Sequence, residues 1–453
     1  MLLWAPLVRG GNRVVAVAVL LGLGLAALAV LLAQSTQAWL GRSAVFDADR
    51  PPSQPAWWWC LVGLLASSPV WLGVGQLWPI PVSWWSALQG REAYLDAMQA
   101  AGVVAAPSLP LSLNPGATWA SLWAGLPVAL AFWLALRLPR ALVDGLMAAL
   151  LLAGALQVLM AVAQFATGRV SALYFGVLGQ GFIGTFANRN HLADFLAMLL
   201  PVWFYGWLRL RRHDHDEERG LGRRLAHKPM LLLLGFAFLV VILSTQSRGG
   251  ILSATAVLLL SALLYGHAFR HQFKPWQRWA MAVLFLVFLA LALGSVDVKG
   301  ILGRVEQGRL QSDAEVRHTM ALATWDAARA LWPWGSGLGS FESVFPRFQP
   351  ASTPNYVNHA HNDYVQLLME LGAAAVLLAL ALLTLVAWQG RALVQAYRNG
   401  DRLSSELGLR LFAGLGALAL LLHSWVEFNM HIPALALTAA FLMGVFLRPL
   451  TSR

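Results

Sequence analysis

The chain has 453 residues, of which 58% are hydrophobic and only 12% are charged. An average soluble domain has about 25% charged residues, so this composition excludes an ordinary soluble protein and indicates a polytopic membrane protein. The formal net charge of +11 does not indicate nucleic-acid binding, because basic cytoplasmic loops account for such an excess in membrane proteins. A single cysteine, Cys60, excludes an internal disulfide and a cysteine-based metal site.

Apolar runs long enough to cross a bilayer recur along the whole chain. We therefore predict an all-α polytopic membrane protein with about eleven (10–12) transmembrane helices in a single integral membrane domain. No small-residue cleavage site follows the first run, so we interpret it as an uncleaved span. The predicted spans are 14–36, 57–78, 118–136, 141–166, 191–208, 230–246, 250–269, 280–295, 364–388, 408–424 and 433–447.

Basic loops predict the orientation of these spans. Segment 209–228 carries seven lysine and arginine residues, which is typical of a cytoplasmic loop. Three other basic loops then fall on the same side of the membrane by alternation. They are 137–140, 270–278 and 391–402.

The remaining connections are predicted to face outward, and two of them are long. Segment 79–117 is rich in proline and predicts a loop along the membrane surface. Segment 296–363 is predicted to be a long periplasmic loop, in which the helical spacing of apolar residues between Asp313 and Trp334 indicates an amphipathic helix. The same alternation places the N-terminus outside.

Polar residues gather where outward segments meet the predicted spans. Arginine on the outer face runs against the usual bias of basic residues to the cytoplasmic side, so these positions need another reason. Guanidinium groups supply one, because they bind diphosphate oxygens in bidentate fashion. The candidate site residues are Asn188, Arg189 and His191 before one span, Arg248 between two spans, Arg317 in the long loop, and His359, His361, Asn362 and Asp363 after it.

Each of these residues also has a structural interpretation. Arg189 could contact lipid headgroups, and Ser247 beside Arg248 could simply cap a helix. Most charges of the long loop could form surface ion pairs. His359 and His361 have no third ligand at a fixed offset, so no metal site is predicted.

Other polar residues lie in or beside the spans. Asp144 and Asp194 are expected to be buried and paired or helix-capping, because a lone charge in a span is costly. A second outward cluster is the most plausible hidden contributor to the site. It consists of His423, Glu427, Asn429 and His431.

Three motifs in order resemble the bacterial superfamily of O-antigen ligases and O-antigen or exopolysaccharide polymerases. The similarity extends over most of the chain, from residue 57 to residue 447. The motifs are GTFANRNH at 184–191, SRGG at 247–250, and GSGLGSF at 335–341 leading to HAHNDY at 359–364.

The resemblance implies a metal-independent, inverting glycosyltransferase without a cofactor in the bacterial inner membrane, with its site facing the periplasm. Its partners would be an undecaprenyl-diphosphate-linked glycan, an acceptor glycan or lipid A-core, and membrane lipids, but no nucleic acid. The family arginines that bind diphosphate correspond to Arg189, Arg248 and Arg317, and the catalytic histidine corresponds to His361.

The choice between polymerase and ligase depends on one position at which this sequence departs from the ligase motif. His361, Asn362 and Gly372 fit the ligase pattern, whereas Val376 stands where ligases have Gly, Thr or Tyr. We therefore favour a polymerase of O-antigen or exopolysaccharide repeat units over a ligase that makes lipopolysaccharide. Two alternatives are not glycosyltransferases. One is a flippase or transporter of the same lipid-linked glycan, and the other is a scaffolding subunit.

The chemistry follows from the residue types alone. A neutral imidazole can take a proton from an acceptor hydroxyl near neutral pH, while fixed arginines stabilise the departing diphosphate. Asn362, Asp363 and Glu370 are equal candidates for the group that orients the imidazole of His361.

Overall fold

The computed structural model of the protein describes most of the chain. The predicted span 280–295 lies mostly outside the described residues, and positions 296–312 of the long loop lie wholly outside them. The described residues are 1–39, 54–103, 106–168, 171–175, 181–213, 221–271, 313–353, 355–399, 403–450 and isolated positions between 274 and 294.

The protein is mostly helical, as predicted, but the expected number of spans is not confirmed. Within the described residues, six helices are long and apolar enough to cross a membrane, or seven if the bent pair α3 and α4 is one span. The six are α7 (Pro115–Arg137), α8 (Arg140–Thr167), α9 (Arg189–His213), α11 (Arg248–Ala268), α17 (Ala373–Arg398) and α18 (Ser405–His423).

Other apolar helices complete the bundle. Helices α3 (Ala56–Ala66) and α4 (Ser68–Leu77) are bent by 60°. Helices α2 (Val14–Trp39), α10 (Leu221–Ser244) and α19 (Pro433–Phe446) contain shorter apolar stretches.

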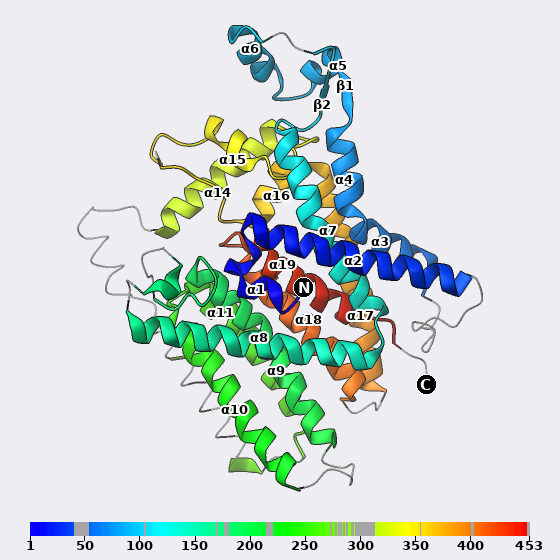
Figure 1. Ribbon diagram of the computed structural model, residues 1–453, viewed down its shortest axis with the longest axis vertical. Coiled ribbons are helices and arrows are strands. Elements are labelled where there is room, and N and C mark those ends of the chain that lie inside the picture. Colours follow the sequence, from blue (N-terminus) through cyan, green and yellow to red (C-terminus); the bar gives the residue numbers. More distant parts are fainter. Residues whose placement is uncertain are drawn as a thin grey trace.

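Helix α9 lies at the centre of the bundle, with α8, α10, α11 and α18 packed around it (Figure 1). Its apolar window is 78% buried, far more than that of any other candidate span. Glycine permits close approach of α18 to α9, because a Cβ at Gly416 of α18 would lie only 2.7 Å from the carbonyl oxygen of Met198.

The predicted span 364–388 is wrong at its start, because the helix breaks at Gly372. This glycine has φ 57°, and a Cβ there would lie 2.0 Å from the carbonyl oxygen of Pro333. The chain therefore forms a short amphipathic helix, α16 (Asp363–Leu371), before α17. Hydropathy cannot detect this break, since it depends on a loop packed against the glycine.

Three short helical elements and α16 pack at one end of the bundle. Helix α14 (Asp313–Ala330) confirms the predicted amphipathic helix, and it is followed by α15 (Phe341–Val344) and the 3-10 helix η3 (Phe345–Arg347). Their buried side chains form a small apolar cluster that includes Ala327, Phe341 and Met369.

Segment 79–117 is more ordered than the predicted surface loop. It contains β1 (Pro79–Pro81), α5 (Val82–Ala87), α6 (Glu92–Ala100) and β2 (Ser108–Pro110), which project from the bundle (Figure 1). The two strands are antiparallel, with Ile80 opposite Leu109. Proline is tolerated in them because a two-stranded sheet consists only of edge strands.

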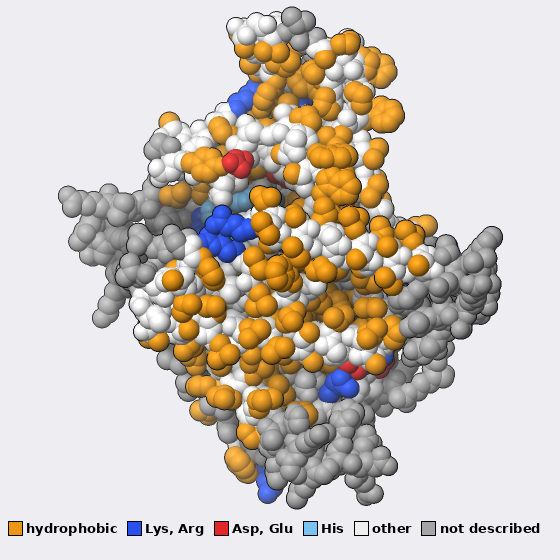
Figure 2. All heavy atoms as spheres, in the orientation of Figure 1, with side chains coloured by type: hydrophobic (Ala, Val, Ile, Leu, Met, Phe, Trp, Pro, Cys, Tyr) orange, Lys and Arg blue, Asp and Glu red, His pale blue; other side chains and the backbone are white. Residues whose placement is uncertain are grey.

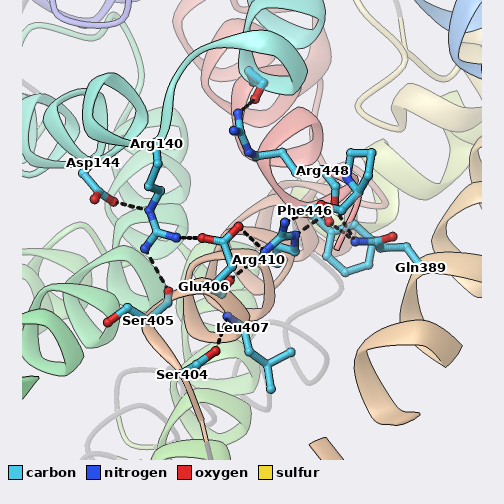
Figure 3. Close-up of polar contacts among 12 residues, drawn as sticks. Arg140, Asp144, Gln389, Ser404, Ser405, Glu406, Leu407, Arg410, Phe446 and Arg448 are labelled. Atoms are coloured by element: carbon cyan, nitrogen blue, oxygen red, sulfur yellow. Dashed lines mark hydrogen bonds and ion pairs between the residues drawn. The ribbon is translucent and has the colours of Figure 1, made fainter. Parts of the chain in front are cut away.

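A network of charged residues closes the other end of the bundle (Figure 3). Arg140 at the start of α8 donates to Asp144 at 3.0 Å and also to Glu406. The buried Arg410 pairs with Glu406 and donates to the carbonyl oxygen of Arg448 at 2.8 Å. The predicted pairing of Asp144 is confirmed, and the starts of α8 and α18 meet the segment after α19.

The N-terminal segment lies at the end of the bundle that also holds the 184–191 motif. It comprises α1 (Trp4–Leu7) and the 3-10 helix η1 (Arg9–Gly11). Buried Gln157 of α8 donates to the carbonyl oxygen of Pro6 at 2.8 Å, and the hydroxyl of Thr185 donates to the same oxygen. This position agrees with the alternation of the predicted spans.

Candidate functional site

His361 pairs with a carboxylate that lies 66 residues further along the chain. Its Nδ1 is 2.7 Å from Oε1 of Glu427, whose side chain is fully buried in the turn after α18. His361 keeps 20% of its side chain exposed and has φ 51°, a left-handed conformation rare for residues other than glycine. Since a carboxylate only accepts, the pairing assigns the proton to Nδ1 and leaves Nε2 as the basic nitrogen.

Two further donors hold Glu427 in its charged form. Arg317 Nη1 donates to Oε2 at 2.8 Å, and the side-chain amide of Asn190 donates to the same oxygen. Burial alone would raise the pKa of Glu427, but the hydrogen bond from His361 and the charge of Arg317 hold it well below its ordinary value. The carboxylate is therefore ionised throughout the physiological pH range.

The turn before α9 is held by glutamines of α8. Gly184 has φ 59°, and a Cβ there would lie 2.4 Å from Oε1 of Gln157. The same oxygen accepts the backbone N–H of Thr185 at 2.9 Å. Gln164 donates to the carbonyl oxygen of Gly184 at 2.5 Å. These contacts fix the backbone from which Asn188 and Arg189 extend.

A cavity of about 760 Å³ opens beside this turn. Arg189 and Arg317 both line it, together with the amides Asn188 and Asn190. The remaining lining consists of small, hydroxyl, amide and aromatic residues. They are Phe165, Gly181, Phe182, Ala187, Ser244, Thr245 and Gln246.

Arg189 in the cavity lining and Arg248 beyond it have no acidic partner in the described part of the chain. Arg189 is half-buried and Arg248 is exposed, and neither forms an ion pair with a described carboxylate. Arg248 is the first residue of α11 and follows the cavity-lining residues 244–246, but it is not itself among the lining residues. Figure 2 shows basic side chains beside histidine on an otherwise mostly hydrophobic face. The Ser247 cap is also present, accepting the Gly250 N–H at 3.3 Å.

The other predicted site residues support the loop that carries His361. His359 stacks on Phe428 with ring centroids 4.4 Å apart, and burial followed by neighbouring histidine charge lowers its pKa to about 3. His359 is therefore neutral. Buried His191 packs edge-on against the same Phe428 at 4.9 Å.

None of the three predicted orienting groups contacts the imidazole of His361, so that prediction is wrong. Asn362 caps α16, because its side-chain oxygen accepts the backbone N–H groups of Tyr364 and Val365. Asp363 is buried and accepts from Nδ1 of His431 at 2.7 Å. Glu370 accepts the backbone N–H groups of Gly339 and Phe341 in the motif 335–341.

The second outward cluster contains the group that sequence reasoning could not assign. Glu427 bonds to His361, and His431 in the 3-10 helix η4 (Asn429–His431) bonds to Asp363. Burial alone would lower the pKa of His431, but the hydrogen bond to Asp363 raises it above its ordinary value. The signal for this cluster is the density of polar residues between two apolar runs.

The described residues offer no group of three or more histidine, cysteine or acidic side chains placed to hold a metal ion. The arrangement instead combines an imidazole base, a buried carboxylate and three guanidinium groups. Such a set can remove a proton from a hydroxyl and bind a polyanion.

Residues 230–380 match the family model of the O-antigen ligases. The match supports membership of the O-antigen ligase and polymerase superfamily, whose motifs the sequence resembles. It includes Arg248, Arg317 and His361 but not the 184–191 motif or Glu427. A comparison with curated proteins gave no match. The O-antigen ligase family suggests a membrane glycosyltransferase of ligase or polymerase type.

Proposed function

We propose that the chain is a membrane glycosyltransferase that transfers a glycan from undecaprenyl diphosphate to an acceptor hydroxyl at the periplasmic face of the bacterial inner membrane. One contact chain supports this function. His361 is bonded to Glu427, Glu427 is bonded to Arg317, and Arg317 lines one cavity together with Arg189. The base and the cationic cavity thus share a single buried carboxylate.

In this reaction the diphosphate occupies the cavity, and the anomeric carbon lies between the diphosphate and His361. Nε2 of His361 accepts the proton of the acceptor hydroxyl, whose oxygen forms a bond to the anomeric carbon. The bond from that carbon to the diphosphate oxygen breaks, and its electron pair leaves with the diphosphate. Attack opposite the leaving group inverts the anomeric configuration.

Glu427 has two roles in this scheme. It keeps the proton on Nδ1 before the reaction, and it stabilises the imidazolium that forms when Nε2 accepts a proton. Arg317 neutralises Glu427 with Nη1, and it also lines the cavity. Arg189 and Arg248 bring charge that no described carboxylate compensates, and this charge stabilises the leaving diphosphate without a metal ion.

We favour a polymerase of repeat units, because Val376 departs from the ligase pattern. The alternative within the same chemistry is a ligase that transfers the glycan to lipid A-core. The two differ only in the acceptor, so the acceptor must be tested directly.

The test uses the purified full chain, a defined undecaprenyl-diphosphate glycan and two candidate acceptors, with products identified by mass. We expect a new glycosidic bond, with His361→Ala reducing the rate to background and the chelator EDTA having no effect. His318→Ala is the matched control, because this histidine is exposed and adjoins Arg317. Full turnover by His361→Ala would remove the proposed base.

The same assay separates the alternative classes. A flippase would move the lipid-linked glycan across vesicles without forming a glycosidic bond. A scaffolding subunit would depend on neither Arg189 nor His361. Product formation that requires both residues contradicts each of these alternatives.

A further inference from the structure

The protein contains a third pairing of a carboxylate with an imidazole, outside the proposed reaction. Asp194 on α9 and His423 at the end of α18 approach to 3.3 Å between Oδ1 and Nδ1, and both side chains are buried. The alignment of the two groups does not make a regular hydrogen bond. Both oxygens of Asp194 lack a hydrogen-bond partner among the described residues. Such a costly group in an apolar helix needs a reason.

The far side of the His423 ring lies against the backbone of α11. A Cβ at Gly249 would be 2.6 Å from Cδ2 of His423 and 2.7 Å from its Nε2. A Cβ at Gly250 would be 2.5 Å from Cβ of Ala193, the neighbour of Asp194. The first turn of α11 thus rests directly on the pair.

Arg248 is the residue that this turn presents. Its side chain is exposed and forms no hydrogen bond or ion pair with a described residue, so only the backbone of the turn fixes its position. Ser247 caps the turn from one side, and His423 supports it from the other. The Asp194 carboxylate lies 3.3 Å from Nδ1 on one edge of the His423 ring, and the opposite edge faces Gly249.

The pair also joins the elements that carry the rest of the site. Arg189 begins α9 five residues before Asp194, and Glu427 follows His423 after four residues. Glu427 is also held by Arg317 and Asn190, and the turn before Arg189 is also held by Gln157 and Gln164.

We infer that Asp194 and His423 are positioning residues that hold Arg248 in place to bind the diphosphate of the donor. This inference rests on the proposed function and adds two residues that touch no substrate. It requires that disturbing the pair weakens donor binding only through Arg248.

The experiment measures the donor KM of the full chain for Asp194→Asn and Arg248→Ala, alone and combined. Each single variant should raise the donor KM about tenfold, the factor for the loss of one charge-assisted contact. The combined variant should equal Arg248→Ala alone, because the pair has nothing left to position. A general structural defect would instead multiply the two effects.

A second variant approaches the same contact from the opposite side and covers the case in which Asp194→Asn does not fold. Gly249→Ala should displace His423, raise the donor KM similarly and add nothing to Arg248→Ala. Ser261→Ala is the matched control, since Ser261 is a buried polar residue in the same helix, far from the turn. It should leave the donor KM unchanged.

The outcomes separate this inference from the proposed function. If the unmodified chain forms no glycosidic bond, or Arg248→Ala leaves the donor KM unchanged, the role of Arg248 in donor binding fails and the inference fails with it. If Arg248→Ala raises the donor KM but Asp194→Asn and Gly249→Ala do not, or act multiplicatively with it, only the positioning role is overturned.

Discussion

Glu427→Gln is the substitution that tests the proposed base most sharply. Glutamine keeps the size of the side chain but removes its charge, and its amide can donate to Nδ1 of His361. Nδ1 then acts as an acceptor, and the proton moves to Nε2, the nitrogen that must accept a proton from the acceptor hydroxyl. The variant should therefore bind donor and acceptor in an unproductive tautomer.

The expected loss can be worked from the geometry of the pair. With Nδ1 and Oε1 2.7 Å apart, the charge centres of imidazolium and carboxylate lie about 4 Å apart, which corresponds to about 4 kcal/mol at an effective dielectric constant near 20. That energy corresponds to roughly a thousandfold in rate. The wrong tautomer adds to it, and a comparable change in a serine protease lowers kcat by about 10,000-fold. We expect a decrease of about 1,000- to 10,000-fold in kcat, with the donor KM much less affected.

The assay is single-turnover formation of the glycosidic bond with saturating donor and acceptor. The control is Glu342→Gln, because Glu342 is an exposed acid that contacts Tyr356. This control should retain full activity. A Glu427→Gln variant with kcat within tenfold of the unmodified chain would refute the roles given to the tautomer and the imidazolium.

Three further predictions concern other parts of the site. Arg189→Lys keeps a charge but loses the bidentate fork, so we expect a decrease of about 100-fold in kcat/KM, and Arg189→Ala should be worse by steady-state assay. The raised pKa of His431 means that the stability it contributes beside Asp363 is fully present below its unfolded pKa of about 6.5 and is lost as pH rises through the higher folded pKa. The Tm difference between the unmodified chain and His431→Gln should therefore be larger near pH 6 than near pH 9, and a difference that grows with pH would contradict the pairing. Gly184→Ala should lower both Tm and activity because of its positive φ and tight packing, whereas Gly145→Ala, with open space around the Cβ, should leave activity unchanged.

Local sequence patterns predicted the structure where it depends on residues that are close together in the sequence. The apolar spacing after Asp313 predicted α14, and hydropathy located most of the apolar helices to within a few residues. Arg189 and Arg317 could be named from their predicted place outside the spans, and the structure brings both to one cavity. Their role in diphosphate binding stays a prediction.

Tertiary contacts account for what the sequence did not predict. The break at Gly372 exists because the Pro333 carbonyl occupies the space of a side chain, and no local property of an apolar run reveals that contact. The partner of His361 could not be chosen because Glu427 lies in a different turn, after another span. Asn362, Asp363 and Glu370 were nearer in sequence, but each binds another group. Asn362 caps α16, Asp363 accepts from His431, and Glu370 accepts backbone N–H groups.

Helix α9 explains why a site made of distant segments can be rigid. Its first turns carry Asn190, His191 and Asp194, which in helical spacing lie near one face. Asn190 bonds to Glu427, and the two residues that follow it on this face contact Phe428 and His423. A substitution of Asn190 or His191 that leaves the helix intact should therefore change the position of the turn after α18. That turn holds the carboxylate on which both the base and the cationic cavity depend.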